Sequence, residues 1–306
     1  MPFPFACDYI RAVKIMSIHA HFDDFEFVAS GTFELWRRKL GSALKARVLV
    51  CTDGKAGHHF RTREETMHIR IREQEQSAVI GGYEFRSLCY PNGEIPREAC
   101  LQMSTPLLAA LWKEIRDFRP DYIFAPPVPA DPLAGIHVDH VTVAEAVRKV
   151  AYMINVPHAF TPEYPADETK SEPCPVPVIL TVHDGYMSGA NIFDLAVDVH
   201  DAFEKMCAMS WCHQSQIAEW LPWVGRHDLK VPGSITEWRG ELEKRFRRRN
   251  RELGLPVDRI REFFTVTAWG NVPTADQVLN DFPDVDRAFS QLDALRARLA
   301  RWRGAE

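Results

Sequence analysis

The chain has 306 residues, 46% of them hydrophobic and 26% charged, which is typical of a globular protein and excludes a disordered chain. Its formal net charge of −5 provides no overall positive field, so the composition argues against general binding of nucleic acid or anionic membranes. The 7 cysteines include no CxxC pair, and no apolar run approaches the roughly 18 residues of a membrane span. We therefore expect a cytoplasmic protein.

Short apolar segments alternate with longer helical segments along the first two thirds of the chain. In chain order, the pattern predicts a strand at 12–19, a helix at 26–40, a strand at 46–51, a helix at 63–80, a strand at 83–90, a helix at 105–118, a strand at 121–125, a helix at 141–154 and a strand at 175–182. Strands that alternate with helices imply right-handed crossovers. We therefore predict an α/β fold with a mostly parallel sheet that is covered on both faces.

Two polar clusters follow predicted strands. AHFDDFE (20–26) comes directly after the first strand, and GIHVDH (135–140) lies between the fourth strand and its helix. In open α/β sheets, ligands bind beyond the carboxyl ends of the strands, so both clusters fall on the expected ligand side.

These clusters contain a complete set of ligands for a catalytic metal ion. His21 and Asp24 are three residues apart in a turn, and His140 supplies a second imidazole. Two imidazoles and one carboxylate with open positions are the arrangement expected of catalytic zinc. Asp23 is then available as a general base, while His137 is suited to stabilise an oxyanion or to protonate a leaving amine.

Asp139 is expected to orient one of the histidines from behind. Either cluster alone is more often a helix cap or a solvated loop. Their coincidence on one predicted edge of the sheet favours an active site.

The same motifs carry a resemblance to a known family. AHFDDFE resembles the AHPDDxE signature, and HVDH the HxDH signature, of the PIG-L/LmbE-like N-acetylglucosaminyl deacetylases. Weaker correspondences are TDG at 52–54 (TxG), REQE at 72–75 followed by Gly81 (RExE), and Lys205 with HQSQ at 213–216 (HxSQ). The main departure is Phe22, which stands where the family pattern has proline; we expect a slightly different loop with the site retained.

The resemblance implies a Rossmann-like three-layer α/β/α sandwich with His21, Asp24 and His140 as ligands of Zn²⁺. It implies that Asp23 activates water and that His137, supported by Asp139, is the electrophilic or acid partner. The expected reaction removes an N-acetyl group from an amino sugar or its conjugate and releases acetate. Fe²⁺ or Co²⁺ could replace zinc, because affinity and metal availability both matter.

Residues outside the motifs allow broader expectations. His183 and Asp184 follow the strand at 175–182 and are predicted to line the substrate pocket; Arg72 could hold a sugar hydroxyl or phosphate, although a solvated ion pair is equally compatible. The polar segment with His58, His59 and Arg61 could form a rim over the site, but an ordinary exposed loop is favoured.

The deacetylase domain is expected at 1–221, with a mainly helical C-terminal extension at 222–306 packed on it. The basic run at 245–251 follows acidic residues in a helical stretch, which favours a solvated or partner-facing helix, while a contact with the pocket or with another copy stays open. A homo-oligomer is also compatible with these helices.

Two alternatives from other classes remain. The same two-histidine, one-carboxylate set suits a non-haem Fe(II) redox enzyme. A non-catalytic sugar-binding protein on the same fold is the other, although simple binding would not require Asp23 and His137 beside the metal. The pattern does not specify which N-acylated substrate is used.

Overall fold

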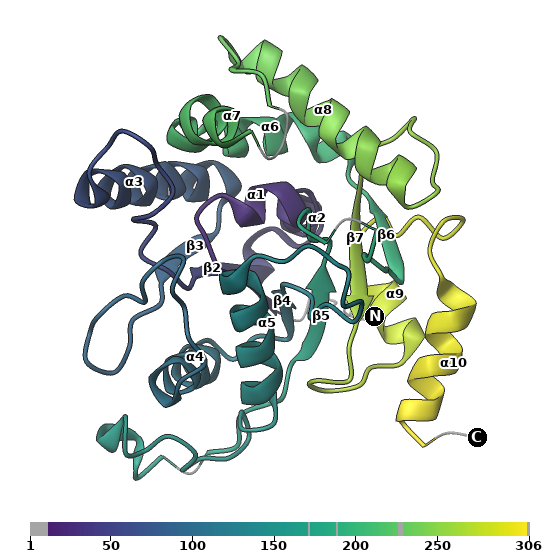
Figure 1. The fold of residues 1–306 in the computed structure, drawn as a ribbon. Coiled ribbons are helices and arrows are strands. Elements are labelled where there is room, and N and C mark those ends of the chain that lie inside the picture. Colours follow the sequence, from purple (N-terminus) through teal and green to yellow (C-terminus); the bar gives the residue numbers. More distant parts are fainter. Residues whose placement is uncertain (1–11, 171, 188, 226–228, 305–306) are drawn as a thin grey trace, which may run out of the picture.

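The computed structural model describes residues 12–170, 172–187, 189–225 and 229–304 (Figure 1). A seven-stranded sheet in the order β3-β2-β1-β4-β5-β7-β6 forms the centre of the molecule. From β3 to β5, neighbouring strands run parallel, whereas β7 is antiparallel to both β5 and β6. This confirms the predicted α/β fold with a mostly parallel sheet. The strands are β1 (Val13–His19), β2 (Leu44–Val50), β3 (Glu84–Ser87), β4 (Tyr122–Ala125), β5 (Val178–Val182), β6 (Leu195–Asp198) and β7 (Arg261–Val266).

Helices cover both faces of the sheet and give the expected three layers (Figure 1). Successive side chains of a strand point to opposite faces, so Ile15 of β1 belongs to one hydrophobic cluster and Met16 to the other. The helices are α1 (Asp24–Val28), α2 (Ser30–Leu40), α3 (Arg63–Gly81), α4 (Thr105–Phe118), α5 (Val138–Ala151), α6 (Phe203–Trp211), α7 (Leu221–Val224), α8 (Ile235–Glu252), α9 (Ala275–Asp281) and α10 (Leu292–Trp302). None of the described helices is long and apolar enough to cross a membrane.

The helix predicted at 26–40 is divided into α1 and α2. Ala29 between them has φ −143°, outside the helical range, and caps α2 with no side-chain hydrogen bond. The buried Glu262 of β7 supplies the missing acceptors: its carboxylate accepts hydrogen bonds from the backbone N–H groups of Gly31 (2.9 Å) and Thr32 (2.8 Å) and from the Thr32 hydroxyl (2.6 Å). A distant carboxylate therefore caps α2, which explains why local sequence did not reveal the break.

The expected domain boundary at residue 221 requires a correction. The described residues of this segment form α8, α9 and α10, and they also contribute β7, which lies between β5 and β6 in the central sheet. The segment therefore completes the core instead of only packing against it.

Strand order places the site. Along the chain, β1, β2 and β3 progress toward one edge of the sheet, whereas β4 and β5 lie on the opposite side of β1. The direction reverses between β1 and β4, and such a switch point leaves a crevice at the carboxyl ends of the two strands. The loops after β1 and β4 are the two that carry the polar motifs.

Substitution of Glu262 by alanine should strongly destabilise the fold. The change leaves three buried donors at the start of α2 without an acceptor, and we expect the free energy of unfolding to fall by about 3 kcal/mol. Denaturant unfolding monitored by circular dichroism measures this. Glu64→Ala, which removes an exposed ion pair with Lys55, is the matched control and should leave the midpoint nearly unchanged. Equal midpoints for the two variants would contradict the capping role.

Candidate active site

Three side chains from the two motifs converge at the switch point. His21 follows β1, Asp24 is the first residue of α1, and His140 lies in the first turn of α5. His21 Nδ1 is 3.1 Å from His140 Nε2 and 3.6 Å from Asp24 Oδ2, and His140 Nε2 is 3.4 Å from Asp24 Oδ2. Ligands about 2.0–2.1 Å from a tetrahedral zinc ion are separated by roughly 3.3–3.4 Å. The three atoms therefore fit the ligand triangle of one divalent metal ion.

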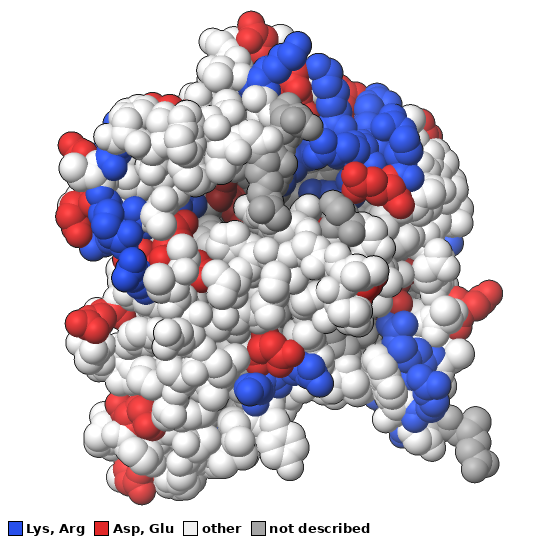
Figure 2. All heavy atoms as spheres, in the orientation of Figure 1, with Lys and Arg blue, Asp and Glu red and all other residues white. Residues whose placement is uncertain are grey.

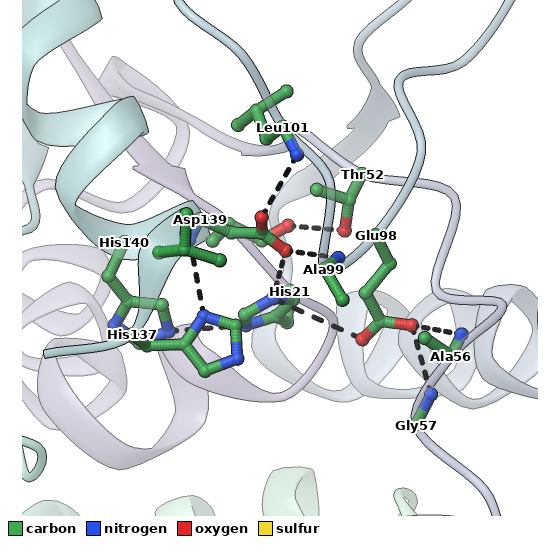
Figure 3. A network of polar contacts seen from close by, with 12 residues as sticks. His21, Thr52, Ala56, Gly57, Glu98, Ala99, Leu101, His137, Asp139 and His140 are labelled. Carbon is green, nitrogen blue, oxygen red and sulfur yellow. Dashed lines mark hydrogen bonds and ion pairs between the residues drawn. The ribbon is translucent and has the colours of Figure 1, made fainter.

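A carboxylate hydrogen-bonds to the second ring nitrogen of each of the two histidines, His21 and His140. Asp139 Oδ2 is 3.0 Å from His21 Nε2, and Asp184 Oδ2 is 2.8 Å from His140 Nδ1. Asp139 is itself fixed by the backbone N–H groups of Ala99 (2.7 Å) and Leu101 (3.2 Å), as Figure 3 shows. Such carboxylate–histidine pairs orient a ring so that its other nitrogen can face a metal. Asp139 was expected to support His137, but its carboxylate contacts His21.

Asp23 lies beside the ligand triangle without joining it. Its backbone is left-handed (φ 79°), an uncommon conformation for a residue with a side chain, and its N–H donates to Gln74 Oε1 at 3.2 Å. Burial raises the pKa of the Asp23 carboxyl to about 7, while Arg70, whose Nη2 is 3.6 Å from Asp23 Oδ1, opposes that rise. The carboxyl is therefore suited to exchange protons near neutral pH.

His137 caps the N-terminus of α5 and faces the same cavity. Its Nδ1 accepts the N–H of Asp139 at 3.3 Å, and its ring centroid is 4.5 Å from that of His21. Burial, and then the charges of His21 and His140, lower the pKa of His137 to about 4. His21, His137 and His140 can also be grouped as ligands, with atoms within 4.8 Å of one another. We propose Asp24 as the third ligand, because its Oδ2 lies 3.6 Å from His21 Nδ1 and 3.4 Å from His140 Nε2.

Arg70 and Glu98 are site residues that the sequence did not indicate. Arg70 Nη1 is 2.8 Å from Glu98 Oε1, and Arg70 Nη2 donates to the Phe22 carbonyl at 3.0 Å. Glu98 also accepts the N–H groups of Ala56 and Gly57, which fixes the loop after β2 (Figure 3). Arg70 lies on the buried face of α3, where the residues are mostly polar, so a search for apolar periodicity could not find it.

Of the three residues predicted to bind substrate, two line the cavity and one does not. Arg72 is exposed on α3 and does not line the cavity, because α3 turns Arg70 inward instead. His183 and Asp184 do line the cavity, although the carboxylate of Asp184 is engaged by His140. A role for Arg72 in substrate binding has no support in this geometry.

The weaker motifs build the frame around the site. Glu73 accepts the N–H and hydroxyl of Ser215 at 2.8 and 2.6 Å, which joins the REQE segment of α3 to the HQSQ segment. His213 is fully buried and pairs with Glu26 at 3.3 Å, a structural role. Phe22, which replaces the proline of the family pattern, is buried with its ring against Gly54. A Cβ added to Gly54 would lie 2.7 Å from the Phe22 ring, so a larger residue than glycine would clash there.

The cavity at this site has a volume of about 100 Å³, small beside the roughly 300–1,000 Å³ of pockets for drug-sized ligands. Besides the residues above, its lining includes Gln216 and Trp220 from the π-helix Ser215–Trp220, Tyr186 after β5, and Arg245 from α8. Gln216 belongs to the HQSQ motif, and Arg245 belongs to the basic run for which a contact with the pocket was left open. Sequence patterns did not indicate Trp220, which reaches the cavity from an element distant in the chain.

The fold and the site together define an α/β protein of enzyme-like design, with a two-histidine, one-carboxylate cluster at the switch point of its sheet. Residues 16–151 match the family model described as GlcNAc-PI de-N-acetylase (PIG-L). This match confirms the resemblance carried by the two motifs. No curated protein matches the chain in sequence.

Several solved structures share the fold. The N,N'-diacetylchitobiose deacetylase of Pyrococcus horikoshii is 21% identical, with 84% of each chain covered and a TM-score of 0.62. The 4-carboxy-2-hydroxymuconate hydratase of Pseudomonas putida KT2440 is 14% identical over 83% of this chain and 96% of its own, with a TM-score of 0.57. A deacetylase involved in the teicoplanin biosynthetic pathway is 12% identical over 84% of this chain and 99% of its own, with a TM-score of 0.51. At these identities the likeness shows the fold alone.

Metal affinity should distinguish the metal ligands from the carboxylates that hydrogen-bond to them. We expect His140→Ala to lose the metal and Asp184→Asn to bind it 10- to 100-fold more weakly, because the ring of His140 is then no longer fixed. Titration of the metal-free protein with Zn²⁺ measures both affinities. Asp117→Asn on the exposed surface of α4 is the control. Undiminished binding by His140→Ala would contradict the assigned ligand set.

Proposed function

We propose that this protein is a metal-dependent N-deacetylase that hydrolyses the N-acetyl group of an amino sugar or sugar conjugate and releases acetate. The observation that carries the proposal is the convergence of His21, Asp24 and His140 within 3.1–3.6 Å, with the carboxyl of Asp23 beside them in one cavity. The match to the PIG-L family model supports the deacetylase chemistry.

The ligand set fits Zn²⁺, and Fe²⁺ or Co²⁺ would accept the same donors. When bound, such an ion supplies a Lewis acid and lowers the pKa of water to roughly 7. His21 and His140 would hold it with Asp24, while Asp139 and Asp184 keep both rings in the tautomer that leaves one nitrogen of each free to bind.

Asp23 is placed to move the protons. As a general base, its carboxylate accepts a proton from the attacking water, and as the carboxylic acid it can return that proton to the nitrogen of the departing amine. The buried Arg70 beside it limits the rise of the Asp23 pKa and thereby keeps the base available. His137 lies across the cavity, where its ring can donate to the oxygen that gains negative charge as the amide carbonyl is attacked.

Aromatic rings at the mouth of the cavity support a sugar as the substrate. Trp220 lines the cavity and stacks with Trp223 at a centroid distance of 5.4 Å, and Trp223 stacks with His59 at 4.5 Å with planes 2° apart. Trp223 is 61% exposed, so this stack offers an apolar face to solvent. The C–H faces of pyranose rings are apolar and pack well on such rings. The stacking of His59 on Trp223 supports a rim at this point, although the sequence favoured an ordinary exposed loop.

Asp23→Asn should retain metal and lose turnover. The amide has nearly the same shape as the carboxylate but cannot accept the proton, so we expect the rate of acetate release from an N-acetylated chitooligosaccharide to fall by about 10²- to 10⁴-fold. Acetate is quantified enzymatically, and metal content is measured on the same samples. A metal-loaded variant that keeps wild-type turnover would remove Asp23 from the mechanism.

Trp220→Ala should weaken binding of sugar substrates. Loss of the ring at the cavity mouth is expected to raise KM several-fold while kcat changes little, because the ring is remote from the proton transfers. Trp302→Ala, on the distant helix α10, is the control. If KM is unchanged with every N-acetylated sugar tested, the aromatic stack has no part in substrate binding.

The two alternatives predict different outcomes. A sugar-binding protein would bind the ligands without releasing acetate, and an Fe(II) redox enzyme would show Fe²⁺-dependent oxygen consumption. The likeness to a hydratase adds a third outcome, water addition to an unsaturated acid, which ultraviolet absorbance detects. The cytoplasmic location and a homo-oligomeric state stay predictions.

A further inference from the structure

Helix α8 brings a cationic side chain into the proposed active site. Arg245, the first residue of the basic run, lines the cavity together with Asp23 and His183. Its guanidinium lies over the ring of Phe27, 4.2 Å from the centroid, and a Cβ placed on Gly185 would be 3.8 Å from its Nη2. The guanidinium therefore lies against the wall formed by α1 and the loop after β5.

Buried polar atoms without partners gather around this position. Within the part of the chain that the structure describes, Arg245 Nη1, Arg249 Nη1 and both ring nitrogens of His183 are buried and have no hydrogen-bond partner. His183 is 5% exposed and Arg249 4%. Burying an unsatisfied polar group is costly, and burying an unpaired charged group costs more. This cluster is consequently incomplete in a way that an anion would remedy.

The positive charges of Arg245 and Arg249 lower the pKa values of their neighbours in this cluster. Burial lowers the pKa of His183 well below its usual range, and the neighbouring Arg249 and Arg245 lower it further. Burial and the charge of Arg245 lower the pKa of Arg249 to about 9, although the buried Glu262 opposes this. Burial also lowers the pKa of Arg245, although the charges of Asp23, Tyr186 and Asp24 oppose this.

Arg245 also lines a second cavity, which links the site to the surface of α8. This groove of about 360 Å³ has five cationic residues and one acidic residue on its walls: Lys244, Arg245, Arg247, Arg248, Arg251 and Glu241, together with Leu229. Figure 2 shows the corresponding cluster of Lys and Arg side chains at the upper right of the molecule, over α8. The inner cavity, at about 100 Å³, is too small for a sugar conjugate, so the rest of the substrate has to extend outward.

From this geometry we infer that Arg245 binds an anionic group on the amine-bearing half of the substrate, a phosphate ester or a carboxylate. The acetamido group reaches the proposed metal ligands, and the anion lies at the junction between the inner cavity and the groove of α8. The neighbouring Arg249 adds positive charge at that point, whereas His183, whose pKa is held well below its usual range, contributes a neutral ring. The inference rests on the proposed function only in that the anion is taken to belong to the amide substrate.

The test compares substrates that differ in one anionic group. Acetate release by the metal-loaded full chain is measured with N-acetylglucosamine, N-acetylglucosamine 6-phosphate and N-acetylmuramic acid, the last of which carries a carboxylate. Charged hydrogen bonds contribute roughly 1.5–3 kcal/mol, so Arg245→Gln should reduce the ratio of kcat/KM for the anionic substrate to that for the neutral one by about 10- to 100-fold. The anion whose ratio depends on Arg245 identifies the phosphate or the carboxylate as the recognised group.

Two variants guard against indirect effects. Arg239→Gln removes one positive charge from the same helix, where Arg239 pairs with Glu204 and Glu243 outside the groove, and should leave the ratio within about threefold of wild type. Arg245→Lys retains the charge and should restore part of the ratio even if Arg245→Gln folds poorly. An equal preference of wild type, Arg245→Gln and Arg245→Lys for neutral and anionic substrates would overturn the inference.

A binding measurement separates this inference from the proposed reaction. Calorimetric titration of the metal-loaded Asp23→Asn protein with the same sugars reports binding without turnover. If the anionic ligands bind more tightly through Arg245 while wild type releases no acetate, the proposed deacetylation fails and anion recognition stands. If acetate is released but binding is indifferent to the anion and to Arg245, the reverse holds.

Discussion

The structure depends on the electrostatic balance at the switch point of the sheet. Four carboxylates, Asp23, Asp24, Glu98 and Asp184, line a cavity that contains only two guanidinium groups, Arg70 and Arg245. Such an excess of negative charge away from bulk water is costly unless a cation offsets it. A divalent ion between His21, Asp24 and His140 would offset it, and the separations of those three ligand atoms suit that ion. Fold, ligand geometry and charge therefore favour the same interpretation.

The parts that the sequence predicted are those with a local signature. Alternation of apolar strands and amphipathic helices indicated the parallel part of the sheet, because that period is set by neighbours in the chain. His21, Asp24 and His140 could be named because each follows a strand within a short polar motif, and the structure brings them together. The motif resemblance to the PIG-L family pointed to the same residues and is supported by the match over 16–151.

Other features depend on contacts that no local pattern encodes. The break between α1 and α2 is stabilised by Glu262, more than 200 positions away. Arg70 was missed because the buried face of its helix is polar, and the neighbouring Arg72, which the motif highlighted, points to solvent. Arg245 and Arg249 belong to a basic run in which Arg248 and Arg251 are exposed, so composition alone suggested a solvated helix. In each case, tertiary packing decides the role of a residue with an ordinary local context.

The position of β7 has a consequence for how the protein is made. β7 separates β5 from β6 although residues 199–260 intervene between β6 and β7 in the chain, so β6 leaves the ribosome well before the strand that joins it to the sheet. Until residue 266 has emerged, the edge of β5 presents unpaired backbone groups, the kind of edge that promotes pairing with other chains. The nascent protein is thus most exposed to aggregation late in synthesis, when His21, Asp24 and His140 are already translated but the wall contributed by α8 has only just formed. Chaperone protection in that interval, more than the stability of the finished sheet, would set the yield of folded protein.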